Sequence, residues 1–238
     1  MNSLFAILFA ASVSTVEIPK EKIQPTITTI QPVVNASPQK DPKATSILKE
    51  VSAKTKSRKT ISLDFTFDIK NGEVSDSQKG SLKIKDNKYT YSIFGVTKIS
   101  DGIKIASVLK EDQEVTIGKI DFNDPDEFSP QEMFTIYETG YKYRFMANKV
   151  IDGESLQLID LYPEAGNKQP YRRVTLYIND VNKEIKKIEL FHKTSGKVFT
   201  VTVTKSTYDL ELKDTEFICD CSRWPSPEWD CDDTSKSK

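Results

Sequence analysis

Few residues of this 238-residue chain have the types and spacing that catalysis requires. The single histidine, His192, stands late in an expected strand, and no histidine-rich metal site or HExxH motif accompanies it. The sequence also lacks a G-x-S-x-G nucleophile elbow, a phosphate-binding glycine-rich loop and a C-x-x-C pair. We therefore expect a protein that is not an enzyme and has no catalytic residue, no cofactor and no resident metal. His192 is expected at a surface or a sheet edge.

Cysteine chemistry is confined to the C-terminal tail. The tail holds Cys219, Cys221 and Cys231, with the acidic neighbours Asp220, Asp230, Asp232 and Asp233. An odd number of cysteines in an exported protein permits one disulfide and leaves a free thiol or an intermolecular bond. We expect Cys219 or Cys221 to pair with Cys231. The loop closed in this way would surround Trp224 and Trp229. A metal site built with the aspartates is the second option.

The charged residues suggest solvated surfaces. A net charge of −1 and a pI near 6.0 give no overall field that would attract nucleic acid. We expect Lys83, Lys85 and Lys88 to line a solvated convex face, with a docking surface as the alternative. An acidic group also precedes an expected helix, at Asp121, Asp124, Asp126 and Glu127. It lacks the glycine and the distal glutamate of a calcium-binding loop, so we interpret it as a solvated loop.

The strongest pattern is the alternation of apolar and polar residues between about Thr60 and Tyr208. In the first strand the apolar positions are Ile61, Leu63, Phe65, Phe67 and Ile69. A period of two puts such residues on one face of a strand. Because hairpin after hairpin repeats the pattern, we expect one long antiparallel sheet with an apolar face. Only two short helices are available to cover it, and a thinly covered apolar surface usually meets something hydrophobic. Here we expect lipid.

The expected elements follow from capping and turn signals. A helix over about 44–56 precedes the sheet, and Asn71-Gly72 is a hairpin turn signal. A second helix has a capping Ser129, a Pro130 at its first position and Gly140 after its end. The expected strands are 59–70, 78–85, 88–94, 103–110, 114–119, 141–150, 155–162, 172–179, 184–193 and 197–210.

Composition divides the chain into four segments. The apolar run Leu4–Val13 is too short to span a bilayer, which takes roughly 20 residues, and resembles the core of a signal peptide at residues 1–15. No cysteine lies near its cleavage site, which argues against an acyl anchor there. Residues 16–43 are rich in proline and polar residues, and we interpret them as a flexible linker. Residues 44–218 form the expected folded domain, and 219–238 form an acidic, cysteine-containing tail.

Four local motifs, in order, carry a resemblance to a known family. They are Ile47–Val51 followed by Ile61–Phe67, then Lys79-Gly80-Ser81-Leu82-Lys83-Ile84-Lys85, then Ile99-Ser100-Asp101-Gly102, and finally Ser129-Pro130-Gln131-Glu132-Met133-Phe134. This order and spacing resemble the LolA family of periplasmic lipoprotein carriers, especially its Bacteroidetes-type members. Two positions depart from the family pattern: Asp86 stands where some members have a lid-tying arginine, and Ile105 replaces a turn aromatic. The tail also differs from the usual family ending.

The resemblance implies a mainly β fold with short helices, an incomplete antiparallel half-barrel whose helices cover the concave face. It implies a monomeric periplasmic chaperone that takes acylated lipoproteins from an inner-membrane ABC exporter and gives them to an outer-membrane acceptor. With the facing pattern, it gives an expected lipid-binding lining of Leu63, Phe65, Phe67, Leu82, Ile84, Tyr89, Tyr91, Ile93, Met133, Phe134 and Ile136.

Other functions remain open at this stage. A lipid- or lipoprotein-sensing interaction module on the same half-barrel is the main alternative, although such regulators carry a second domain. A membrane-anchored lipoprotein acceptor lacks support because no lipobox cysteine follows the apolar run. A lipid-modifying enzyme lacks support because no nucleophile–base pair is evident.

Overall fold

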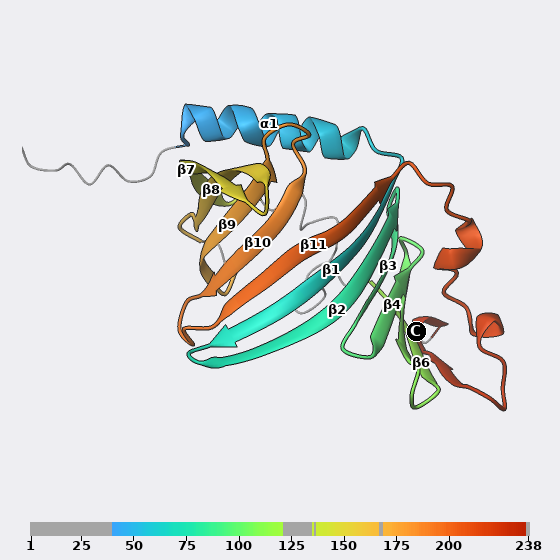
Figure 1. Ribbon diagram of the computed structural model, residues 1–238. Coiled ribbons are helices and arrows are strands. Elements are labelled where there is room, and N and C mark those ends of the chain that lie inside the picture. Colours follow the sequence, from blue (N-terminus) through green and yellow to red (C-terminus); the bar gives the residue numbers. More distant parts are fainter. Residues whose placement is uncertain (1–39, 121–134, 136, 167–168, 237–238) are drawn as a thin grey trace, which may run out of the picture. The chain divides into compact units, whose positions relative to one another are not determined.

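The computed structural model describes residues 40–120, 135, 137–166 and 169–236, all within one compact unit (Figure 1). The first expected segment, most of the linker and the greater part of the helix expected after Ser129 lie outside these residues. Helix α1 spans Pro42–Lys56. The first group of strands comprises β1 (Thr60–Asn71), β2 (Val74–Lys85), β3 (Lys88–Ile93), β4 (Val96–Ser100), β5 (Lys104–Leu109) and β6 (Glu114–Lys119). The second comprises β7 (Tyr141–Ile151), β8 (Glu154–Pro163), β9 (Tyr171–Asn179), β10 (Ile185–His192) and β11 (Val198–Tyr208).

The residues after β11, which we call the tail from here on, add short elements. These are the 3-10 helices η1 (Asp214–Phe217), η2 (Cys221–Arg223) and η3 (Thr234–Lys236), and the strand β12 (Asp230–Asp233). Neither β12 nor β4 was expected from the sequence. Both are short, and neither shows the apolar alternation that marks the longer strands.

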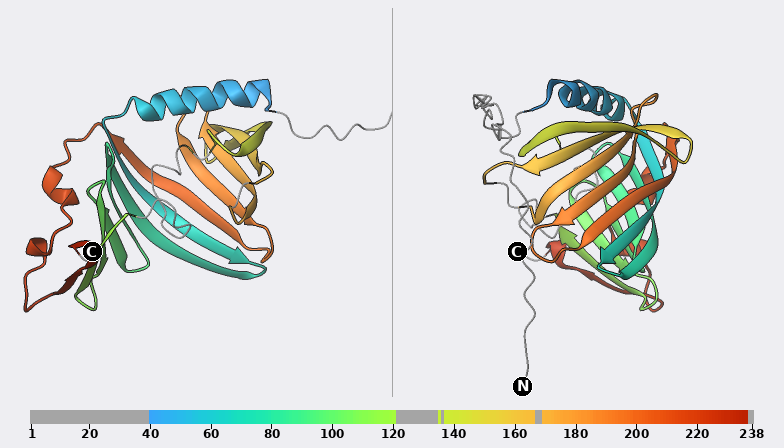
Figure 2. Two further views of the ribbon diagram at one scale, coloured as in Figure 1. Left: turned by 180° about the vertical axis from the view of Figure 1, so that it is seen from behind. Right: turned by 60° about the vertical axis from the view of Figure 1, so that its left-hand side comes forward.

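All strands of the described residues join one sheet in the order β12-β6-β5-β4-β3-β2-β1-β11-β10-β9-β8-β7. Neighbours are antiparallel except β12, which runs parallel to β6. Two meanders, β1–β6 and β7–β11, are joined where β1 pairs with β11. The sheet curves strongly but remains open, with β7 and β12 at its two edges (Figures 1 and 2). This confirms the expected mainly β, incomplete half-barrel.

Helix α1 crosses one end of β7 to β11 (Figure 1). Its buried residues Ala44, Ile47, Leu48 and Val51 pack into a core cluster with inward residues of these strands. We call the side of the sheet that meets α1 the inner face, and the other side the outer face. Alternation along each strand and the register between strands then assign the residues of the sheet to one of the two faces.

Asp41 caps α1, which begins at Pro42, two residues before the expected start at residue 44. The Asp41 carboxylate accepts hydrogen bonds from the backbone N–H groups of Lys43 (2.8 Å) and Ala44 (3.3 Å). It also accepts one from Phe145 in β7 (3.1 Å). Pro42 occupies the first helical position, where a missing N–H costs nothing. One side chain thus caps the helix and ties it to the sheet edge.

The apolar residues change face partway across the sheet. From β7 through β11 and β1 to β3 most of them lie on the inner face, as the pairs Leu63↔Leu82 and Ile84↔Tyr89 show. In β4, β5 and β6 the buried apolar residues other than Ile105 lie on the outer face and pair with one another: Ile99↔Ala106, Ala106↔Ile117 and Val108↔Val115. The tail covers this outer strip, which gives the sheet a second apolar cluster on its outer face.

We predict that the Asp41 cap makes the stability of the fold pH-dependent. Partial burial alone would raise the pKa of Asp41, but the three backbone N–H groups outweigh it and hold the pKa below the ordinary 3.8. A carboxyl with a lowered folded-state pKa stabilises fully above its unfolded pKa and loses this contribution as pH falls through the folded value. Asp41→Asn keeps one acceptor oxygen for the helix but loses the charge and the oxygen that accepts from Phe145, so it should lower the free energy of unfolding by about 1 kcal/mol at pH 7. The difference from wild type should shrink below pH ~4.

Urea unfolding of both proteins from pH 7 down to pH 2.5 measures this difference. The matched control is Asp112→Asn in the exposed turn between β5 and β6. A constant gap between wild type and Asp41→Asn at all pH values would contradict the capping account.

Candidate functional site

The predicted lining residues of β1, β2 and β3 share the inner face. Leu63, Leu82, Ile84 and Tyr89 are buried, and they form a cluster with Ile61 and Ile105. Met133, Phe134 and Ile136, expected from the second helix, lie outside the described residues. Ile105, which stands where the LolA family has an aromatic residue, is a buried member of this cluster.

The remaining predicted lining residues are only half-buried. They are Phe65, Phe67, Tyr91 and Ile93. Phe65 packs against both inner-face clusters and so connects the part under α1 with the part on β1 to β3. Its ring lies over Gly80, where an added Cβ would stand 2.4 Å from the ring. Gly80 therefore makes room for Phe65, which is the reason that a strand interior tolerates glycine at this point.

The two ends of the inner face differ in their cover. At the end crossed by α1, the cavity lined by Arg58, Ile61, Leu63, Ile185, Tyr208 and neighbouring residues has a volume of about 20 Å³, enough for a water molecule. At the other end, aromatic rings form a partly exposed row. We call it the aromatic rim: Phe67, Phe94, Tyr171, His192 and Phe199. The inner face is thus closely packed at one end and partly solvent-exposed at the other.

Phe94 is the most exposed member of the aromatic rim, at 50%. It stands in the β3–β4 turn with a positive φ of 54°, a conformation that costs a bulky residue about 1 kcal/mol or more. Its ring meets the edge of Phe67 at 5.7 Å between centroids, and Phe67 stacks against Phe199 at 6.0 Å. A large aromatic held exposed in a strained turn is unexpected for a residue that serves packing alone.

Sequence reasoning missed the contribution of the second meander. Its half-buried residues Phe145, Tyr171, Leu190 and Val203 pack against the same inner-face clusters, and Phe199 contacts the rings of Phe67 and Tyr171. The signal was present, since Phe199, Val201 and Val203 alternate as clearly as the residues of β1 do. Register with the first meander supplies the missing step: Phe67 pairs with Val201, and Ile69 pairs with Phe199.

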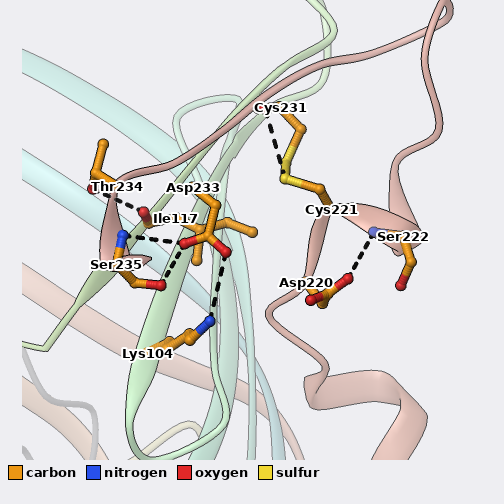
Figure 3. The surroundings of a disulfide bond; sticks show 9 residues. All are labelled: Lys104, Ile117, Asp220, Cys221, Ser222, Cys231, Asp233, Thr234 and Ser235. Atoms are coloured by element: carbon orange, nitrogen blue, oxygen red, sulfur yellow. Dashed lines mark hydrogen bonds and ion pairs between the residues drawn. A yellow bond between two sulfur atoms is a disulfide. The ribbon is translucent and has the colours of Figure 1, made fainter. Parts of the chain in front are cut away.

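The tail is held on the outer face by a disulfide and a short strand (Figure 3). Cys221 bonds to Cys231, one of the two pairings expected, and Cys219 is a buried free thiol. Trp224 and the disulfide cover Ile99, Ala106, Val108, Val115 and Ile117. The Thr234 hydroxyl donates to the Ile117 carbonyl at 2.9 Å. The tail thus buries the apolar strip that β4 to β6 present outward.

Lys83, Lys85 and Lys88 lie on the outer face, where carboxylates of η1 pair with all three. Lys83 pairs with Glu216 at 2.6 Å, and Lys85 and Lys88 pair with Asp214 at 3.1 and 2.9 Å. These lysines are partly exposed, but they meet the protein's own η1 rather than solvent alone. The sequence could not show this, because the partners lie more than a hundred residues along the chain.

The metal option for the tail finds no ligand set within the part of the chain that the structure describes. Asp220 caps the backbone N–H of Ser222 at 2.9 Å (Figure 3). Asp233 accepts from the N–H of Ser235 and pairs with Lys104 at 3.5 Å. The acidic group at residues 121–127 lies outside the described residues. Two of the four aspartates of the tail, Asp220 and Asp233, therefore have structural partners.

His192 has a local structural role. Its Nδ1 accepts from the backbone N–H groups of Thr194 (3.3 Å) and Ser195 (3.2 Å), which shapes the turn after β10. The ring edge also meets Tyr171 in the aromatic rim. Among the helices described, none is long and apolar enough to cross a membrane.

We predict that the tail disulfide contributes to stability and that Cys219 is unreactive in the native protein. Closing a loop of about this length is worth roughly 3 kcal/mol. Cys221→Ser with Cys231→Ser should lower the free energy of unfolding by that order. Burial raises the pKa of the Cys219 thiol to about 11, so iodoacetamide at pH 8 should modify it only after unfolding.

Mass spectrometry after alkylation, with and without denaturant, measures thiol accessibility. Glu228→Ser, an exposed change in the same loop, is the control for the double serine variant. Modification of Cys219 in the native protein at the rate of an exposed thiol would contradict the burial of its side chain against the sheet.

Comparison with known proteins gives matches of structure alone. No protein-family model matches the sequence, and no curated protein matches it. An uncharacterized conserved protein from Thermus thermophilus is similar in structure, with a TM-score of 0.53 and 8% identity over 80% of this chain and 99% of that one. The lipoprotein LppX of Mycobacterium tuberculosis gives 0.49 and 15% identity, over 73% of this chain and 98% of that one. A LolA superfamily protein from Nitrosomonas europaea gives 0.40 and 14%, over 74% and 97%. This chain therefore shares the fold of the Thermus protein.

Proposed function

We propose that this protein is a carrier that shelters the acyl chains of lipoproteins on its inner face and moves them across the periplasm from the inner to the outer membrane. The observation that carries this proposal is the inner face itself. It is packed under α1 at one end and ends in half-exposed aromatic side chains at the other. Aromatic and aliphatic surfaces without fixed polar groups suit a fluid, non-directional ligand.

The energetics favour partial shelter over full enclosure. Each methylene removed from water is worth about 0.8 kcal/mol, so one acyl chain of ordinary membrane length is worth roughly 12 kcal/mol. Two or three chains would exceed the practical limit on non-covalent affinity, about −18 to −21 kcal/mol. A carrier must release its cargo and therefore has to recover only part of this free energy. An open sheet with a half-exposed rim meets this requirement.

The partners of such a carrier follow from its task. The cargo would be acylated lipoproteins, delivered by an inner-membrane ABC exporter and received by an outer-membrane acceptor. The resemblance of the motifs between Ile47 and Phe134 to the LolA family supports these partners. The half-buried Phe65, Phe67, Tyr91 and Ile93 are the proposed contacts for the acyl chains. The buried Leu63, Leu82, Ile84 and Tyr89 lie beside them on the same face of the sheet.

We predict that the aromatic rim carries acyl-chain affinity. Phe67→Gln should weaken binding of a fluorescent long-chain fatty acid by about tenfold, because it removes roughly 1.5 kcal/mol of apolar contact. Thr66→Gln, the neighbouring outer-face position, is the matched control and should bind as wild type does. Fluorescence titration measures the affinities, and circular dichroism verifies folding. Equal affinity of a folded Phe67→Gln and of wild type would contradict the proposed site.

The carrier function itself is tested by extraction of cargo from a membrane. The protein is incubated with vesicles that contain a triacylated cysteinyl peptide and is then separated by flotation. We expect native mass spectrometry to find the peptide bound to the soluble protein, whereas a non-acylated peptide of the same sequence stays unbound. A protein that leaves the triacylated peptide in the vesicles would overturn the proposed function.

A further inference from the structure

The inner face changes from apolar to a mixture of polar and apolar residues between β3 and β4. In β1 to β3 its residues are aliphatic or aromatic, as described above. In β4 and β5 the inward positions are Val96, Lys98, Ser100, Ile105, Ser107 and Leu109, and in β6 they are Glu114, Thr116 and Gly118. The same side of one continuous sheet thus carries an apolar area and, beside it, a strip with hydroxyl groups and one ammonium group. The carboxylate of Glu114 stands exposed at the start of β6, at the end of this strip.

The cause of this polar strip is the change of face described for the apolar residues. Successive side chains of a strand point to opposite faces of the sheet. Strands β4 to β6 direct most of their buried apolar residues outward, to the tail with Trp224 and the Cys221–Cys231 disulfide. Their inward positions are consequently free to be polar. The tail therefore has a consequence on the far side of the sheet, because it removes the need for an apolar inner face in these strands.

Lys98 occupies the border between the two areas. It is half-buried, and its cross-strand neighbours are Tyr91 in β3 and Ser107 in β5. Side chains directly opposite each other in neighbouring strands have Cβ atoms about 5 Å apart. Lys98 takes part in none of the ion pairs between described residues, in contrast to Lys83, Lys85 and Lys88 on the outer face. A half-buried ammonium beside an aromatic ring gains from a bound anion.

We propose that Lys98, with the hydroxyls of Ser107 and Thr116, binds the anionic headgroup of an acyl lipid whose chain lies across the apolar inner face of β3, β2 and β1. The proposal rests on the acyl-chain binding proposed above and adds the class of headgroup. The dimensions agree. Strands lie about 4.8 Å apart, so β4 and β1 are separated by about 14 Å. One leaflet of a bilayer's hydrocarbon core is about 15 Å thick. A chain anchored at Lys98 would reach Phe65 on β1.

The test compares single-chain amphiphiles that share a twelve-carbon chain and differ in headgroup. Dodecyl phosphate and laurate are anionic, and monolauroylglycerol is neutral. Each is titrated below its micelle-forming concentration by calorimetry, and inorganic phosphate is titrated alone. Wild type should bind the two anionic amphiphiles about tenfold more tightly than the neutral one, since a charge-assisted hydrogen bond is worth about 1.5 kcal/mol or more. Inorganic phosphate should bind far more weakly than dodecyl phosphate.

Variants assign the preference to Lys98. Lys98→Gln should lose the preference for the anionic amphiphiles, and Lys98→Arg should keep it. Lys79→Gln is the matched control, because Lys79 is an exposed residue on the outer face of β2. Circular dichroism verifies that each variant folds. The preference should also fall as salt is raised.

The outcomes separate the two proposals. If monolauroylglycerol binds and the anionic amphiphiles bind no better, the headgroup assignment is overturned while the proposed function stands. A preference that survives in Lys98→Gln, or that Lys79→Gln removes equally, also overturns it. Inorganic phosphate that binds as tightly as dodecyl phosphate would show a free-anion site and would overturn the lipid assignment. If no amphiphile binds to wild type, both proposals fail.

Discussion

Successive side chains of a strand point to opposite faces of the sheet, so an apolar strip on either face needs its own cover. This constraint governs the molecule. Eleven of the strands, β1 to β11, form one long antiparallel sheet, and no second sheet packs against it among the residues described. Each apolar strip of the sheet therefore needs another cover. Helix α1 covers one end of the inner face through Ile47, Leu48 and Val51. The tail covers the outer strip of β4 to β6. Neither element covers the aromatic rim, where the rings of Phe67 and Phe199 are half-exposed.

The two covers are attached to the sheet separately. Asp41 couples α1 to β7 through a carboxylate that caps the helix and accepts from Phe145. The Cys221–Cys231 disulfide and β12 couple the tail to β6. These two attachments are at β7 and at β6, so neither α1 nor the tail covers the middle of the inner face. Stability is thus supplied at the margins of the sheet, and the apolar area that would meet a ligand is not required to be sealed. A sheet of this kind can remain folded while part of its apolar surface is kept for an acyl chain.

The sequence predicted what depends on local pattern. Alternation in β1 identified the inner-face set from Leu63 to Phe67, and the helix before it was evident from Ile47, Leu48 and Val51. It missed what depends on pairing between distant segments. Ile99 and Ile117 point to the outer face, where Trp224 buries them. The segment β12 is a strand because it pairs with the edge of β6. The lysines assigned to solvent pair with Asp214 and Glu216 for the same reason. Long-range partners of this kind leave no periodic trace in the sequence.

The central claim is that acyl chains contact the inner face and not the tail-covered outer one. A fatty acid with a diazirine at its terminal carbon, photolysed with the protein and followed by peptide mass spectrometry, tests this contact directly. We expect labels on inner-face residues of β1, β3 and β11, with Phe67, Tyr91 and Phe199 among them. Labels confined to the outer strip around Val108 and Trp224, or no labelling that excess unlabelled fatty acid can compete away, would contradict the account.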